Sequence, residues 1–136
     1  MLAATILTAV LYAEQAKDAA GLRPYRLSVV LAAEADELRY CAWVEETHWG
    51  VAGAYTIFVD PRLLATGRCG KGDSLRRTMA HEVCHILSDS NVLRMWAGLD
   101  KKEADRRHRI VRRCAKSLDK ELSKREHVVV LSGHHE

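Results

Sequence analysis

The segment 73–87 reads DSLRRTMAHEVCHIL, and it holds an HExxH pattern at positions 81–85. Asp73 and Ser74 are residue types that favour a helix N-cap. The apolar residues that follow them recur at the spacing of one helix face: Leu75, Met79, Val83, Ile86 and Leu87. The segment therefore predicts a helix that buries one side and carries its two histidines on the flank of that side.

The two histidines of this segment have the spacing of a metal site. His81 and His85 are four residues apart, so on a helix their imidazoles lie one above the other and can reach one ion. Zinc binds neutral imidazoles, and in hydrolytic sites it keeps one position for water while a nearby carboxylate removes a proton. The pattern predicts His81 and His85 as zinc ligands and Glu82 as the general base. The alternative is a histidine pair that binds no metal.

Length and charge bound the class of protein. The chain has 136 residues, which fits a single domain over 1–136 with one hydrophobic core. Its net charge of +3 is unevenly distributed. Segment 101–126 carries eleven Lys and Arg against five Asp and Glu, so its charge is +6 and that of the remainder is −3. The basic excess belongs to this one segment.

The cysteines and the first residues bear on the compartment. The four cysteines are widely spaced and form no CxxC pair: Cys41, Cys69, Cys84 and Cys114. Residues 1–13 are apolar, but they lack a basic leading segment and are too few to cross a bilayer. These features predict free thiols and a cytoplasmic protein that does not associate with membranes. Cys84 is expected to be a core residue.

The remaining segments predict a helix followed by strands and a second long helix. Ile6, Val10, Ala13 and Ala20 form the apolar face of a first helix. Period-two alternation and turn residues predict three strands, at 25–31, 40–47 and 54–59. Apolar residues at helical spacing predict a long helix over 100–122, and a closing strand is expected at 127–131. This segregated order is typical of the α+β class.

Strand 54–59, the HExxH helix and the helix after it resemble, over roughly residues 55–110, the zincin metallopeptidases. The resemblance implies a minimal zincin-like domain with an N-terminal helix, a small three-stranded sheet, the HExxH active-site helix and a long C-terminal helix. It also implies a zinc-dependent peptidase with His81 and His85 as ligands and Glu82 as base. In this superfamily an extended protein or peptide substrate pairs with the strand, which forms the edge of the sheet.

The third zinc ligand decides the subgroup. Ser88 and Asn91 stand where the metzincin pattern HExxHxxGxxH has glycine and histidine, which excludes that branch. Glu103-Ala104-Asp105 resembles the segment that supplies a glutamate ligand in gluzincins, including small peptidases of phages and mobile elements. The resemblance implies Glu103 as the ligand. In those relatives the ligand commonly lies three residues before the alanine, where this chain has Lys101.

His108 is the alternate third ligand. It lies on the apolar face of the long helix, where it can approach the metal, hydrogen-bond to a ligand, or be a core histidine. The donor that stabilises the oxyanion of the reaction is left open among Tyr55, His48 and His108.

A second hypothesis is a binding module of another class. In it the basic helix 101–125 contacts nucleic acid, and the HExxH residues hold a structural zinc. The alternative for this helix is a solvated charged face. The segment contains no Phe, Tyr or Trp, so it offers no stacking platform for single strands. The sequence indicates no oligomeric state and no particular substrate.

Overall fold

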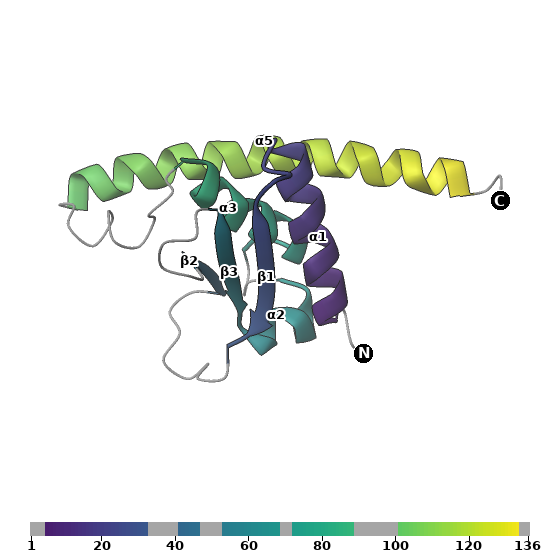
Figure 1. Ribbon diagram of the computed structural model, residues 1–136, viewed down its shortest axis with the longest axis horizontal. Helices are drawn as coiled ribbons and strands as arrows, with labels where there is room; N and C mark the ends of the chain where they lie inside the picture. The colour runs from purple at the N-terminus through teal and green to yellow at the C-terminus, as the bar shows by residue number, and fades with distance from the viewer. Residues whose placement is uncertain (1–4, 33–40, 47–52, 69–71, 89–100, 134–136) are drawn as a thin grey trace.

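A computed structural model describes residues 5–32, 41–46, 53–68, 72–88 and 101–133 of the chain. The described elements follow the order α1 (Ile6–Ala19), β1 (Arg26–Leu31), β2 (Ala42–Glu46), β3 (Ala54–Val59), α2 (Pro61–Thr66), α3 (Leu75–Ser88) and α5 (Lys101–Gly133) (Figure 1). Helices and strands are segregated along the chain, and the predicted α+β class is confirmed.

The three strands form one mixed sheet in the order β1-β3-β2. β1 pairs parallel with β3, and β2 pairs antiparallel with it. The expectation that strand 54–59 forms the edge of the sheet is therefore wrong, because β3 is the central strand. Its sequence explains this position, since every residue of Ala54–Val59 is buried or half-buried on both faces of the sheet.

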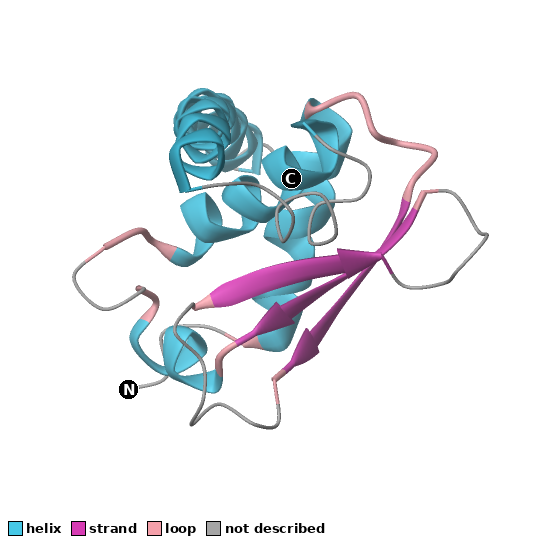
Figure 2. Ribbon diagram, turned by 90° about the vertical axis from the view of Figure 1, so that its left-hand side faces the viewer, coloured by secondary structure: helices cyan, strands magenta, loops and turns pink. Residues whose placement is uncertain are grey.

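The main helices cover one face of this sheet (Figure 2). The residues that the sheet contributes to the core alternate along the strands: Leu27, Val29, Ala42, Val44, Tyr55, Ile57 and Val59. α1 packs on β1 and α3, and α3 packs on β2. α5 lies across α3 and α1 on the side away from the sheet (Figure 1). The core therefore has a sheet layer and a layer of α1 and α3, with α5 over them.

Local capping sets the start of α3 and with it the positions of its histidines. The Ser74 Oγ accepts a hydrogen bond from the Arg77 N–H at 3.2 Å, as an N-cap residue does. The backbone carbonyl of Ser74 accepts the first intrahelical bond, from the Thr78 N–H. The predicted helix and its N-cap at Ser74 are confirmed. α3 then runs without interruption through the HExxH residues.

Two links hold α3 against α5. Cys84 and Cys114 form a disulfide between the two helices. Asp119 of α5 is buried and accepts hydrogen bonds from Arg76 at 2.7 Å and from Arg77 at 3.2 Å. Both links lie along the same helix pair, one on each side of the turn of α3 that carries His81. This pairing fixes the position of α5 relative to the HExxH residues.

The disulfide corrects the prediction of free thiols. None of the described cysteines is free: Cys41 is also disulfide-bonded, and Cys69 lies outside the described residues. The spacing did not indicate this, because Cys84 and Cys114 are 30 residues apart and meet only when α5 packs on α3. The prediction that Cys84 is a core residue is confirmed, since its side chain is fully buried.

The expected closing strand at 127–131 is also wrong. These residues belong to α5, which continues to Gly133. Extending an existing helix adds one hydrogen bond for each residue fixed, whereas a strand needs a free sheet edge beside it. Across the part of the chain that the structure describes, no helix is both long and apolar enough to span a membrane.

Candidate metal centre

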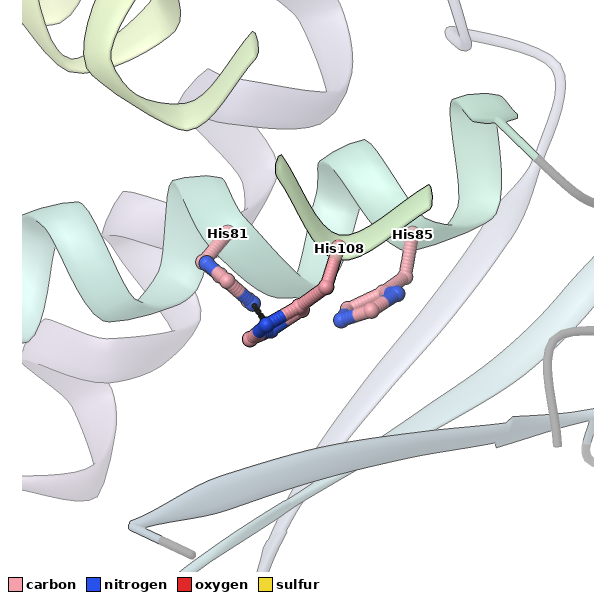
Figure 3. A group of neighbouring side chains, drawn as sticks. All are labelled: His81, His85 and His108. Carbon is pink, nitrogen blue, oxygen red and sulfur yellow. Dashed lines mark hydrogen bonds between the residues drawn. The ribbon is translucent and has the colours of Figure 1, made fainter. Parts of the chain in front are cut away.

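Three histidines from two helices come together at the junction of α3 and α5. His81 and His85 belong to α3, and His108 belongs to α5. Their ligand-capable nitrogen atoms all lie within 4.8 Å of one another. The three rings form a compact group (Figure 3), with centroids 4.9 Å apart for His81 and His85, 5.0 Å for His81 and His108, and 5.9 Å for His85 and His108. The structure thus places the alternate third ligand, His108, beside the HExxH pair.

The position of His108 follows from the apolar face of α5. Val111, Ala115, Leu118 and Leu122 are buried and pack in the core. His108 precedes Val111 by three residues, so its side chain leaves the helix on the same side. The link between Cys84 and Cys114 holds this part of α5 over the turn of α3 that carries His85. Packing of the two helices therefore assembles the cluster.

The separation of the nitrogens fits a small metal ion. With zinc-to-nitrogen bonds of about 2.0–2.1 Å, two imidazole nitrogens on a tetrahedral ion lie about 3.3 Å apart. The Nε2 atoms of His81 and His108 are 3.2 Å apart. The ligand-capable nitrogen of His85 lies within 4.8 Å of those of the other two histidines. Three imidazoles are a donor set that suits zinc, copper, iron or nickel.

The protonation states of the histidines also suit a metal. Burial is the main cause that lowers the pKa of His81 to about 4 and that of His85 to about 3, with neighbouring histidines adding to both shifts. Burial also lowers the pKa of His108, with Arg112 contributing. The three imidazoles are therefore neutral at pH 7, which is the form that binds metal.

Charged side chains lie around the rim of the cluster. Arg112 lowers the pKa of both His81 and His108. Asp73 raises the pKa of His81, and Asp105 raises that of His108. Arg112 follows His108 by one helical turn and shares its row on α5. The spacing of four residues between His108 and Arg112 is visible in the sequence. It could have predicted that Arg112 lies at the site and not on the solvated basic face of the helix.

Glu82 lies next to the histidines on α3 and is buried. Its burial raises the pKa of its carboxyl well above the ordinary value. Within the part of the chain that the structure describes, its carboxyl makes no hydrogen bond or ion pair, and burial is the sole cause of the shift. The raised pKa favours the protonated, neutral form of this carboxyl in the metal-free protein.

Glu103 does not join the three histidines. Its carboxylate pairs with Arg106 at 2.7 Å and with Arg107 at 3.2 Å. The hydrogen bonds from these two arginines hold the pKa of Glu103 at about 2. The group of described residues that is arranged to hold an ion consists of His81, His85 and His108. Glu103 is instead part of a charge cluster on α5.

The other expected donors are not placed in this group. Tyr55 is buried in the core and stacks on Tyr25, with ring centroids 5.9 Å apart and planes 5° apart. His48 lies outside the described residues. Of the three side chains expected as oxyanion donors, only His108 is shown at the site.

In comparisons with known protein families, with curated proteins and with solved structures, nothing matched this chain.

Proposed function

We propose that the chain is a zinc-dependent metallopeptidase with a minimal zincin-like fold. The observation that carries the proposal is the convergence of three neutral imidazoles, His81, His85 and His108, on the helix pair whose α3 also carries the buried Glu82. Three protein ligands leave one position of a tetrahedral zinc ion for water or substrate, as in catalytic rather than structural sites. The third ligand in this proposal is a histidine, so the site departs from the glutamate-containing gluzincin set.

Each residue of the cluster has a role in peptide hydrolysis. When bound, zinc supplies Lewis-acid polarisation of the scissile carbonyl and lowers the pKa of water. In the metal-bound protein Glu82 would be ionised, because a nearby positive charge lowers the pKa of a carboxyl. It would then remove a proton from the attacking water and deliver it to the leaving amine. Arg112 carries a positive charge close to His81 and His108, where it stabilises negative charge on the carbonyl oxygen.

The substrate in this proposal is a protein or peptide in extended conformation. Because β3 has strands on both sides, a peptide cannot pair with it. β2 (Ala42–Glu46) is the sheet edge that packs against α3, the helix that carries His81 and His85. We therefore assign the substrate strand to the outer edge of β2, with which no described strand pairs, because backbone hydrogen bonds there give affinity that does not depend on sequence.

Metal analysis of two matched variants tests the ligand set. The wild-type protein is expected to bind about one zinc ion, since the described residues contain one such cluster of ligands. His108→Ala should weaken zinc binding at least about tenfold, whereas Glu103→Ala should leave it unchanged. Isothermal titration with zinc and elemental analysis of the purified proteins measure both effects. Loss of zinc in Glu103→Ala with retention in His108→Ala would contradict the proposed site.

Activity measurements test the role of Glu82. Glu82→Gln should retain zinc and lower cleavage of unfolded casein or of a peptide library by at least about 10²-fold, as expected for loss of a general base. Glu121→Gln changes an exposed carboxylate of α5 outside both the metal cluster and β2, so this control should keep its activity. A Glu82→Gln protein as active as the wild type would rule out the assigned base.

A cytoplasmic location stays a prediction. The link between Cys84 and Cys114 argues against it, because thiols in the cytosol are kept reduced and disulfides persist mainly in oxidising compartments. The proposed peptidase is consistent with such a compartment.

A further inference from the structure

The outer side of α5 carries one continuous row of cations. At 100° per residue, seven exposed basic residues lie within about 40° of a single line along the helix: Lys102, Arg106, Arg109, Arg113, Lys116, Lys120 and Lys124. We call this set the basic stripe. Its line is opposite to the buried face that contains Val111, Ala115 and Leu122. In Figure 1 the other described elements lie on the opposite side of α5, so they leave the stripe open.

Acidic residues neutralise little of the basic stripe. Arg106 pairs with Glu103. In the portion of the chain that the structure describes, the other six stripe residues take part in no ion pair. The buried carboxylate of α5, Asp119, is turned inward to Arg76 and Arg77. The exposed acidic residues nearest in sequence, Asp105 and Glu121, fall on the flanks of the stripe rather than within it.

The length of the stripe matches a repeat of double-helical nucleic acid. From Lys102 to Lys124 the helix rises about 33 Å, at 1.5 Å per residue. One turn of B-form DNA rises about 34–36 Å. The stripe presents about one cation for each helical turn of α5 over that length. We propose that the basic stripe of α5 binds the phosphate backbone of duplex nucleic acid without reading its sequence.

The composition of the stripe favours a duplex over two other polyanions. Single-strand binding uses aromatic side chains on which bases stack, and segment 101–125 has no Phe, Tyr or Trp. Membrane-surface helices insert an apolar face into the lipid. The apolar face of α5 is already buried in the core of this protein, and the stripe itself contains no apolar residue. A rigid row of charges without such groups suits the regular phosphates of a duplex.

The stripe and the metal cluster lie on different sides of α5. His108 contacts His81 of α3, whereas the line of the stripe is opposite the buried face of α5 that packs on α3. Binding at one surface therefore does not block the other. The proposed stripe is independent of the peptidase assignment, and either can fail without the other.

Fluorescence anisotropy with a labelled DNA duplex of about 21 base pairs, two helical turns, tests the stripe. We expect a dissociation constant of about 10⁻⁴ to 10⁻⁶ M at physiological salt, with a steep loss of affinity as salt rises. The stripe variant Arg113→Gln, Lys116→Gln and Lys120→Gln should flatten the slope of log affinity against log salt by about 3, at about 0.9 per lost phosphate contact. All three side chains are exposed, so the fold and zinc binding should be unchanged.

Two matched variants separate the stripe from net charge and from misfolding. Arg23→Gln, Arg26→Gln and Arg68→Gln remove the same charge from exposed positions outside α5 and should leave the slope nearly unchanged. Arg113→Lys, Lys116→Arg and Lys120→Arg keep the charge of the stripe and should keep its affinity.

Several outcomes would overturn the proposal. One is no binding of the duplex at about 50 mM salt, where phosphate contacts are strongest. Another is an equal loss of affinity in the two glutamine variants, which would make binding an effect of net charge. A third is tighter binding to a single strand, to vesicles with anionic lipids or to polyglutamate than to the duplex, which would assign the stripe to a different partner.

Discussion

At the scale of single residues, Glu82 has an environment that is unfavourable for stability. Its carboxyl is buried, and burial raises its pKa. In the unfolded chain the Glu82 carboxyl ionises above its ordinary pKa of 4.5. In the folded protein the same carboxyl stays protonated to a higher pH. Its contribution to stability is therefore full below pH 4.5 and is lost as pH rises toward the folded pKa. The residue assigned to catalysis thus weakens the metal-free fold at neutral pH.

We predict that Glu82→Gln stabilises the metal-free protein at pH 7. Each unit of pKa shift removed corresponds to about 1.4 kcal/mol, and the expected rise in Tm is about 3 °C or more for a chain of this size. Thermal unfolding in the presence of a chelator measures it, with the exposed Glu46→Gln as control. If the difference in Tm between Glu82→Gln and the wild type disappears at pH 4, the titration of Glu82 explains it. A lower Tm for Glu82→Gln than for the wild type at pH 7 would refute the predicted stabilisation.

The residues of the site differ in how far the sequence could predict them. His81 and His85 lie one helical turn apart, so local geometry alone brings them together. His108 is 27 positions from His81, and its approach depends on the packing of α5 on α3. The resemblance to the gluzincins favours Glu103 over His108, because that set is completed by a carboxylate. The local salt bridges of Glu103 with Arg106 and Arg107, at helical spacings of three and four, were visible in the sequence as competing partners.

At the scale of secondary-structure elements, the site depends on how α3 and α5 are held together. The Cys84–Cys114 disulfide joins the helix of His85 to the helix of His108. Asp119 adds a second link, through Arg76 and Arg77. Neither link includes one of the three histidines. Both links hold α5 against α3, so they limit how far His108 can move from α3.

We predict that removing the disulfide weakens both the fold and the site. The double variant Cys84→Ala and Cys114→Ala should lose about 2–5 kcal/mol of unfolding free energy. It should also bind zinc about 10 to 100-fold more weakly, as when the support of a ligand is removed. Denaturant unfolding and zinc titration measure the two effects. Reductant should cause the same losses in the wild type. The double variant has no Cys84–Cys114 disulfide to reduce, so reductant should cause no further loss through this link. Unchanged zinc affinity in the double variant and in the reduced wild type would show that packing alone positions His108.

The strands show what an element's own sequence can and cannot predict. The range of β3 was predicted as 54–59 because its apolar residues end at Asp60-Pro61, and the structure gives the same range. Its place in the sheet was not predicted, because neighbours in a sheet are chosen by pairing between distant segments. Residues 127–131 show the converse case. Their β-branched composition favours a strand, but these residues directly follow a long helical segment and continue the helix α5.

At the scale of the whole molecule, the buried histidines make the stability of the metal-free protein depend on pH. In the unfolded chain a histidine has a pKa near 6.5, whereas in the folded protein the pKa is about 4 for His81 and about 3 for His85. The unfolded state therefore binds more protons as pH falls below 6.5. The stability contributed by these residues is full above that value and is lost progressively toward pH 3.

We predict that the Tm of the metal-free protein falls steadily between pH 6.5 and pH 4.5. The acidic groups with lowered pKa values, Asp18, Asp60 and Glu103, lose their contribution mainly below their ordinary values of 3.8 to 4.5. Glu82 opposes the fall, because its raised pKa makes its contribution grow as pH decreases, but the two buried histidines outweigh this one carboxyl. A variant with His81→Gln and His85→Gln should have a much flatter profile over the same range. Identical slopes for this variant and the wild type would show that other groups cause the loss.

The short contact between His81 and His108 has a consequence for the tautomers of the two rings. Their Nε2 atoms are 3.2 Å apart and both rings are neutral, so one Nε2 donates a proton and the other accepts it. The donor ring is then the Nε2-H tautomer and the acceptor ring is the Nδ1-H tautomer. An ion held by both Nε2 atoms needs both lone pairs, so the shared proton must move to Nδ1 of the donor ring. In the metal-free protein a single hydrogen atom thus occupies the space between the rings, and metal entry requires a tautomeric exchange in one of them.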